Sequence, residues 1–257
     1  MIRSIVLGLM ISMALAAHTA AQNQGAFADD PYQPNVKYDG RFTFVRIRYT
    51  PLNDGGGFGR FRGGRNDPKW DHDYAKGERH FSKILAELTT LRARTENTNI
   101  LTLDDPELFK FPVAYLCEPG FWNPSDKEVA GLRSYLTKGG FIIFDDFVGN
   151  QIYNLEGQLR KVLPEARMIP LTPAHPLFDA FYRIPSLDYV HPYFGQPSIF
   201  FGIFVDNDPT KRLMAVINYT NDISEYWEWS DTGQFAIDLS NDAYKLGVNY
   251  VVYALTR

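Results

Sequence analysis

The sequence predicts an α/β fold in which a mainly parallel β-sheet carries an appended β-hairpin. Short apolar runs alternate along the chain with segments of helical periodicity, as in sheets built from β-α units. Residues 141–144 form an apolar run between a glycine helix stop and two aspartates, which is typical of a central parallel strand. Apolar runs at 199–205 and 213–219 flank the turn sequence Asp-Asn-Asp-Pro and indicate the hairpin.

Three strands and two helices are expected before the central strand, and the second helix is described below. Residues 42–49 are rich in aromatic and β-branched side chains, the composition of a strand. Residues 77–94 carry apolar side chains three or four positions apart, which predicts a helix with one buried stripe. Residues 100–103 and 113–117 are short apolar runs separated by a segment that opens Asp-Asp-Pro, and each predicts a strand.

The second half of the chain continues this alternation and ends in a helix. Ser125 and Glu128 have the spacing of a capping box, and the helix that they begin stops at Gly139, directly before the central strand. After that strand we expect a helix at 155–163, a strand at 166–171, a short helix at 175–181 and a closing helix at 242–255.

The N-terminal residues have the pattern of a cleaved secretory signal. A basic residue precedes an apolar run at 5–17, and small residues follow at 19–21. The run is shorter than the roughly 20 residues of a membrane-spanning helix. We therefore expect a periplasmic or secreted protein without a membrane span in the mature chain, organised as a signal peptide at 1–21, a polar linker at 22–39 and a single domain at 40–257.

Charge and cysteine content narrow the range of partners. The formal net charge is -4, which disfavours nonspecific binding to nucleic acid, so a small ligand or an envelope protein is the expected partner.

Cys117 is the only cysteine, which excludes an intramolecular disulfide. It is either a small buried hydrophobic residue or, from its position at a strand end, a reactive thiol. The glycine- and arginine-rich segment 55–65 is expected to be a flap or a partner-contacting loop.

Candidate site residues gather where the predicted parallel strands end, the edge at which open α/β sheets bind ligands. Asp145, Asp146 and His175 are the candidate catalytic residues. In strand geometry the two aspartates point to opposite faces, so one could cap a loop or pair with an arginine while the other faces a cleft. The candidate ligand-binding residues offer charges and aromatic faces near these acids, and core packing is the alternative role of the tryptophans: Arg48, Trp70, Asp71, Glu118 and Trp122.

An ordered series of motifs resembles the bacterial domain of unknown function 4159 family over residues 41–256. The motifs are Leu132-Arg133-x-Tyr135-Leu136-x-x-Gly139-Gly140-Phe141, Asp145-Asp146, Leu163-Pro164-Glu165, His175-Pro176-Leu177-Phe178 and Tyr244-x-Leu246-Gly247-Val248-Asn249. The resemblance implies a flavodoxin-like three-layer sandwich akin to class I glutamine amidotransferases. It implies no established activity.

The chain lacks the groups with which amidotransferases of this fold act. Those enzymes use a cysteine at a Gly-x-Cys-x-Gly elbow after the central strand and a distant His-x-Glu, and neither motif is present. Two functions stay open: an exported binding or protein-interaction module, and a hydrolase of carbohydrate or cell-envelope substrates that uses Asp146 with His175. No motif indicates a cofactor. A metal site formed by Asp146, His175 and a third acid would suit zinc or manganese by ligand type, but no close His-x-x-x-His or Asp-x-Asp spacing supports those residues, so we predict no metal.

Overall fold

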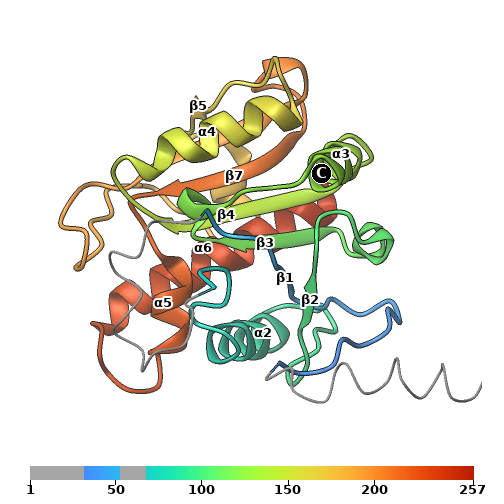
Figure 1. Ribbon diagram of the computed structural model, residues 1–257. Helices are drawn as coiled ribbons and strands as arrows, with labels where there is room; N and C mark the ends of the chain where they lie inside the picture. The colour runs from blue at the N-terminus through green and yellow to red at the C-terminus, as the bar shows by residue number, and fades with distance from the viewer. Residues whose placement is uncertain (1–31, 53–67) are drawn as a thin grey trace, which may run out of the picture. The chain divides into compact units, whose positions relative to one another are not determined.

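The centre of the structure is a seven-stranded, mostly parallel β-sheet (Figure 1). It is described by a computed structural model of residues 32–52 and 68–257. The predicted signal peptide and the segment 55–65 lie outside the described residues. The strands, in spatial order, are β2 (Asn99–Leu101), β1 (Val45–Ile47), β3 (Val113–Cys117), β4 (Phe141–Phe147), β7 (Leu213–Tyr219), β6 (Ile199–Phe204) and β5 (Ile169–Pro170).

The sheet has a parallel part and an antiparallel edge. β2, β1, β3, β4 and β7 run parallel to one another, whereas β6 is antiparallel to β7 and β5 is antiparallel to β6. β3 and the first four residues of β4 are unbroken apolar runs because both faces of the sheet are covered. The mixed α/β fold with a mostly parallel sheet is therefore confirmed.

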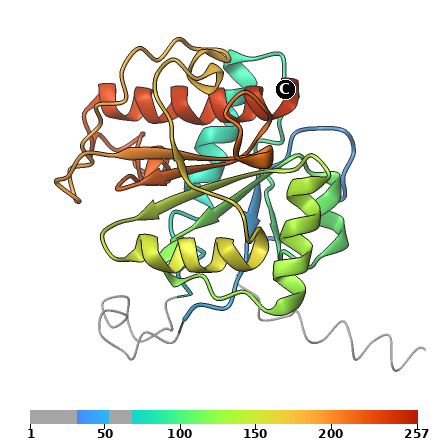
Figure 2. The ribbon, with the colours of Figure 1, turned by 90° about the horizontal axis from the view of Figure 1, so that it is seen from above.

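Five α-helices in the described part of the chain cover the two faces. Figures 1 and 2 show α3 (Asp126–Thr137) and α4 (Gln151–Val162) on one face and α2 (Lys76–Leu88), α5 (Ile223–Glu228) and α6 (Ile237–Thr256) on the other. The second group packs tightly, with the rings of Phe81 in α2 and Trp227 in α5 stacked at 4.4 Å between centroids. None of the helices in the described ranges combines the length and apolarity that crossing a bilayer requires.

Several element boundaries differ from the prediction for local reasons. α2 ends at Leu88, six residues before the expected end, because the Thr89 hydroxyl donates to the Leu85 carbonyl and accepts from the Leu91 N–H, which turns the chain out of the helix. The strand expected at 166–171 is reduced to Ile169–Pro170, an edge strand in which proline removes a ladder donor. The short helix expected at 175–181 is a 3₁₀ turn, η4 (Pro176–Asp179).

Two further differences concern the site described below. β4 continues past residue 144 through both aspartates to Phe147, and α5 was not expected at all.

Within the segment expected to be a linker, Asn35 and Val36 exchange hydrogen bonds with Asn99 and Ile100 on the edge strand β2.

Gly131 marks the closest approach of α3 to the loop after β2. A Cβ atom at this position would lie 2.0 Å from the carbonyl oxygen of Leu103, so the backbone would have to move. We predict that Gly131→Ala lowers the free energy of unfolding by about 1–3 kcal/mol, although alanine is the better helix former. Urea unfolding followed by circular dichroism measures the change.

Gly157 in α4 is the matched control, because a Cβ atom there meets nothing within 4 Å. Gly157→Ala is expected to raise the free energy of unfolding by about 0.5–1 kcal/mol. A stabilising Gly131→Ala would contradict the close helix–loop contact.

Candidate functional site

Titratable side chains from separate segments meet at the carboxyl edge of the parallel strands. Glu118 follows β3, Asp145 and Asp146 lie near the end of β4, and His72 comes from the segment before α2. Because the strands are parallel and adjacent, their ends bring these groups to one edge of the sheet. This edge is the candidate functional site.

The two aspartates have different environments. Asp145 is completely buried, and its carboxylate accepts hydrogen bonds from the Tyr115 hydroxyl at 2.8 Å, the Asn218 amide at 2.9 Å and the Ile223 N–H at 2.9 Å. Asp146 is partly exposed and has a left-handed backbone with φ of 61°. Asp145 is thus held by structural contacts, and Asp146 is the aspartate that faces the site.

His72, Glu118 and Asp146 form what we call the strand-end cluster. The Nδ1 atom of His72 lies 2.6 Å from Glu118 Oε1 and 3.8 Å from Asp146 Oδ2. One nitrogen or oxygen atom from each of the three residues lies within 4.8 Å of the others. The sequence analysis did not single out His72, because the segment that carries it is distant in sequence from both strand ends. The feature of the sequence that could have indicated His72 is the motif Trp70-Asp71-His72-Asp73-Tyr74, in which acidic and aromatic residues flank the histidine.

A buried arginine positions the segment that carries His72. Arg46 in β1 is fully buried, and its Nε donates to Glu78 Oε1 of α2. Its Nη1 donates to the Trp70 carbonyl oxygen at 2.9 Å, and its guanidinium carbon lies 5.0 Å from the centre of the Tyr115 ring. β1, α2 and β3 together therefore fix the backbone two residues before His72.

Opposite charges hold the strand-end cluster together. Burial acts to lower the pKa of His72, but its hydrogen bonds to Asp146 and Glu118 and their charges raise that pKa to about 11. Burial raises the pKa of Glu118 to about 7, with His72 opposing the rise and the charge of Asp146 adding to it. The imidazole is therefore a cation that bridges two carboxyl groups at neutral pH.

Further carboxyl groups surround the cluster. Burial, and after it the negative charge of Asp146, raise the pKa values of Asp73, Asp145 and Asp222, that of Asp145 to about 7. Burial and the charge of Asp73 raise the pKa of Glu225 to about 8. Such crowding of like charges favours a cation or a hydrogen-bond donor as the occupant of the site.

His175 lies away from the cluster. Its Nδ1 accepts a hydrogen bond from the Leu177 N–H at 3.2 Å, so it caps η4. Its ring packs against Phe204 and against Tyr253, whose own ring contacts Phe141 at the first residue of β4. The structure thus places His175 near the start of β4 and Asp146 near its end, and it does not bring the two together.

The expected ligand-binding residues have mixed positions. Glu118 belongs to the cluster. Trp70 and Trp122 are 4% and 0% exposed, so neither offers an open ring face for a sugar. The guanidinium carbon of Arg48 lies 4.9 Å from the centre of the Trp70 ring, and Asp71 is half-buried in the same segment as His72.

Cys117 is a free cysteine at the end of β3. It is fully buried, and burial followed by the negative charge of Asp146 raises the pKa of its thiol. Its Sγ donates to Asp146 Oδ2 at 3.5 Å. A buried thiol with a raised pKa is a poor nucleophile, so Cys117 contributes packing rather than reactivity here.

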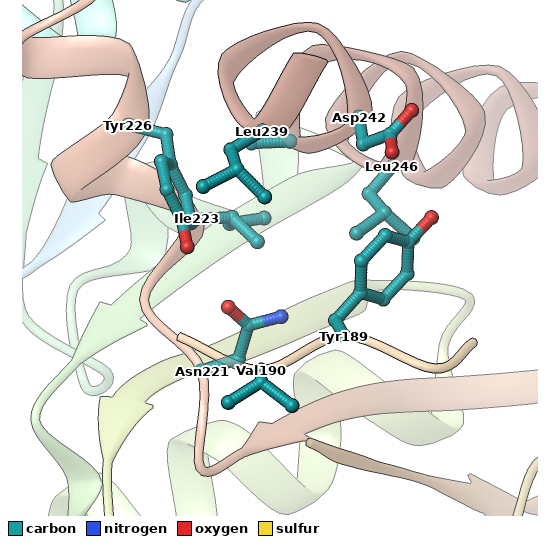
Figure 3. Close-up of a pocket in the computed structure, with 9 residues that line it drawn as sticks. Tyr189, Val190, Asn221, Ile223, Tyr226, Leu239, Asp242 and Leu246 are labelled. Carbon is teal, nitrogen blue, oxygen red and sulfur yellow. The ribbon is translucent and has the colours of Figure 1, made fainter. Parts of the chain in front are cut away.

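A small pocket borders the site at the end of β7. Figure 3 shows side chains from four segments around it, and its cavity volume of about 10 Å³ holds at most about one water molecule. The backbone carbonyl of one lining residue, Asn221, accepts from the Asp146 N–H at 3.1 Å. A more open groove of about 440 Å³ shares Tyr189, Val190, Leu239 and Asp242 with this pocket and is also lined by Asp188. This groove is the alternative place for a ligand.

A family model described as Domain of unknown function (DUF4159) matches residues 43–255. The match begins just before β1 and ends within the last turn of α6, so it includes the whole sheet and the strand-end cluster. The description assigns no activity. No curated protein matches the sequence.

The different surroundings of the two aspartates lead to a stability prediction. Asp145→Ala leaves buried donors of Tyr115, Asn218 and Ile223 without their acceptor and is expected to lower the free energy of unfolding by about 3–5 kcal/mol. Asp146→Ala removes a partly exposed carboxylate that repels its neighbours, so the expected change is within about 1 kcal/mol. Urea unfolding of both variants checks this, and equal losses would refute the assignment of roles.

Glu225 gives a prediction of pH dependence. Its folded pKa is raised from 4.5 to about 8, so between these values the folded protein holds a proton that the unfolded chain has released. This contribution to stability is present below about pH 4.5 and is lost as the pH rises to about 8. In Glu225→Gln the loss of stability between pH 5 and pH 8 should shrink by on the order of 1 kcal/mol, after allowance for solvent screening.

Urea unfolding at pH 5, 6.5 and 8 measures the effect. Asp188→Asn is the control, because Asp188 is an exposed carboxylate away from the cluster. If the wild type and Glu225→Gln lose the same stability over this range, the raised pKa of Glu225 is wrong.

Proposed function

The chain belongs to the Domain of unknown function (DUF4159) family, and we propose that it is an exported binding module whose ligand contacts His72, Glu118 and Asp146. The observation that carries this proposal is the convergence of these three side chains, from three segments, at the carboxyl edge of a parallel sheet. Export is inferred from the signal pattern at residues 1–21.

Backbone strain supports a functional role for the same edge. Among the described residues, non-glycine positions with left-handed backbone include Lys69, Asp73, Glu118, Asp146 and Thr220, which lie in the segment before α2 or just at the ends of β3, β4 and β7. Such conformations are unfavourable by about 1–3 kcal/mol each and gather at ligand sites. The two other left-handed non-glycine residues in the described ranges, Asp206 and Asn207, lie in the turn between β6 and β7.

The charges indicate the chemical class of the ligand. Asp73, Asp222 and Glu225 add acidic groups around the cluster. Among the described residues, the cations that contact its carboxyl groups include the imidazolium of His72 and the ammonium of Lys69, whose Nζ lies 3.7 Å from Glu118 Oε2. An amine, a hydroxyl-rich sugar or a metal ion satisfies such acceptors, whereas an anion does not.

The scaffold in this proposal is flavodoxin-like and related to class I glutamine amidotransferases, with a hairpin appended. The spatial order of the parallel strands, β2-β1-β3-β4-β7, supports the flavodoxin-like description. The antiparallel neighbours β6 and β7 support the hairpin. The central strand ends in aspartates, and Cys117 is buried on the neighbouring strand, so the thiol chemistry of an amidotransferase is not part of the proposal.

A hydrolase of carbohydrate or cell-envelope substrates is the second candidate. Asp146 is the partly exposed carboxylate near the end of the central strand, and His72 takes the role that was predicted for His175. Glu118, with its pKa near 7, adds a group that donates or accepts a proton at neutral pH. In this candidate Asp146 is the base or nucleophile and Glu118 the acid.

Thermal unfolding in the presence of sugars, peptidoglycan fragments, polyamines and amino acids tests the binding role. A ligand at 100 times its Kd stabilises the protein by about 2.7 kcal/mol, which raises Tm by roughly 5–10 °C for a domain of this size. We expect the rise to disappear in Asp146→Asn and in Glu118→Gln and to persist in Asp188→Asn, which changes the neighbouring groove.

Two outcomes change the proposal. A rise lost only in Asp188→Asn moves the ligand to the groove. Release of product from peptidoglycan or polysaccharide by the wild type, lost in Asp146→Asn, favours the hydrolase.

A further inference from the structure

We propose that His72, Glu118 and Asp146 bind a divalent transition-metal ion, Zn²⁺ or Mn²⁺, at the carboxyl edge of the sheet. The inference rests on the proposed function, since it names the ligand, or one part of the ligand, of the same site. No metal was predicted here from the sequence, because no His-x-x-x-His spacing is present and His72 is far in sequence from Glu118 and Asp146.

The geometry suits a three-ligand site after small side-chain movements and release of the His72 imidazole proton, because a ring nitrogen binds a metal only when it is unprotonated. Zinc binds nitrogen and oxygen ligands at about 2.0–2.2 Å, so neighbouring ligand atoms in a tetrahedral site are about 3.4 Å apart. His72 Nδ1 lies 2.6 Å from Glu118 Oε1 and 3.8 Å from Asp146 Oδ2, distances on either side of that value. Three protein ligands leave at least one position for water or an organic ligand.

Glu118 provides a second, independent observation. The residue is 8% exposed, and its Oε2 atom is buried without a hydrogen-bond partner among the residues that the structure describes. Lys69 Nζ lies 3.7 Å from this oxygen, beyond hydrogen-bond distance. A buried carboxylate oxygen without a hydrogen bond is unfavourable, and a metal ion bound by the carboxylate would supply the missing interaction.

The residues around the strand-end cluster hold its three side chains in place, as the residues around a metal site do. Glu118 and Asp146 are both fixed by left-handed backbone at strand ends rather than carried on mobile loops, and the backbone N–H of Asp146 is held by the Asn221 carbonyl at 3.1 Å. Arg46 holds the segment of His72 through Trp70. A preformed metal site requires ligand residues whose backbone is held in place by their neighbours.

The donor set decides the class of ion. One imidazole nitrogen with two carboxylates suits Zn²⁺ and Mn²⁺, whereas Ca²⁺ and Mg²⁺ prefer oxygen ligands alone. Two other groups at this edge could compete for an ion: Asp73, Cys117 and Asp146, in which a thiolate would favour Zn²⁺, and Asp73, Glu225 and Glu228, in which carboxylates alone would favour Ca²⁺ or Mg²⁺. Variants separate the three groups.

Calorimetric titration of the chelator-stripped protein with Zn²⁺, Mn²⁺, Mg²⁺ and Ca²⁺ is the experiment, with thermal unfolding in parallel. We expect one ion per chain for Zn²⁺ or Mn²⁺, with affinity reduced at least about tenfold in His72→Gln, Glu118→Gln and Asp146→Asn. Cys117→Ser and Glu225→Gln are the matched controls and should bind as the wild type does. For Mn²⁺, the electron paramagnetic resonance signal of the bound ion gives a readout independent of stability.

Other results overturn the inference. The inference is wrong if no saturable binding occurs, or if binding is unchanged in His72→Gln, Glu118→Gln and Asp146→Asn. It is also wrong if binding is lost in Cys117→Ser or Glu225→Gln. Circular dichroism of each variant without metal separates lost binding from lost folding, and Glu118→Gln preserves the shape of the side chain. If an organic ligand still raises Tm with chelator present while no ion binds, the metal inference fails and the binding function stands. If neither an organic ligand nor a metal ion changes Tm, the metal inference and the proposed binding function are both wrong.

Discussion

The structure depends most on one buried carboxylate, that of Asp145. It accepts hydrogen bonds from Tyr115 in β3, Asn218 in β7 and the first backbone N–H groups of α5, so one side chain ties two neighbouring strands and a helix to β4. A carboxylate taken out of water is stable only when its oxygens are satisfied in this way. Asp146, the next residue, has a left-handed backbone at an irregularity of β4, and its partly exposed carboxylate is available to the site.

The second anchor is the buried pair of Arg46 and Glu78. It joins β1 to α2, and the same guanidinium holds the Trp70 carbonyl. Breaking such a pair leaves an uncompensated buried charge and is more damaging than losing a surface ion pair. The position of His72 thus follows from packing within the sheet.

The strand-end cluster is where the protein departs from maximal stability. Left-handed backbone, crowded carboxyl groups and a buried oxygen of Glu118 without a hydrogen bond are each unfavourable, and all occur at one edge of the sheet. The start of α3, by contrast, follows the ordinary rules of helix capping, with a capping box formed by Ser125 and Glu128. Local exceptions of this kind are expected where binding or catalysis is selected.

The sequence by itself determined the alternation of strands and helices, the central strand and the candidate edge, because apolar periodicity and helix caps are local signals. It left open which of Asp145 and Asp146 faces the site. Only the tertiary structure decided which of them is buried, that Trp122 lies in the core, and that His72 rather than His175 approaches Asp146. These depend on contacts between segments far apart in the chain, for which a single sequence carries no periodic signal. The length of α2 was likewise set by one side-chain hydrogen bond of Thr89, which the apolar pattern does not encode.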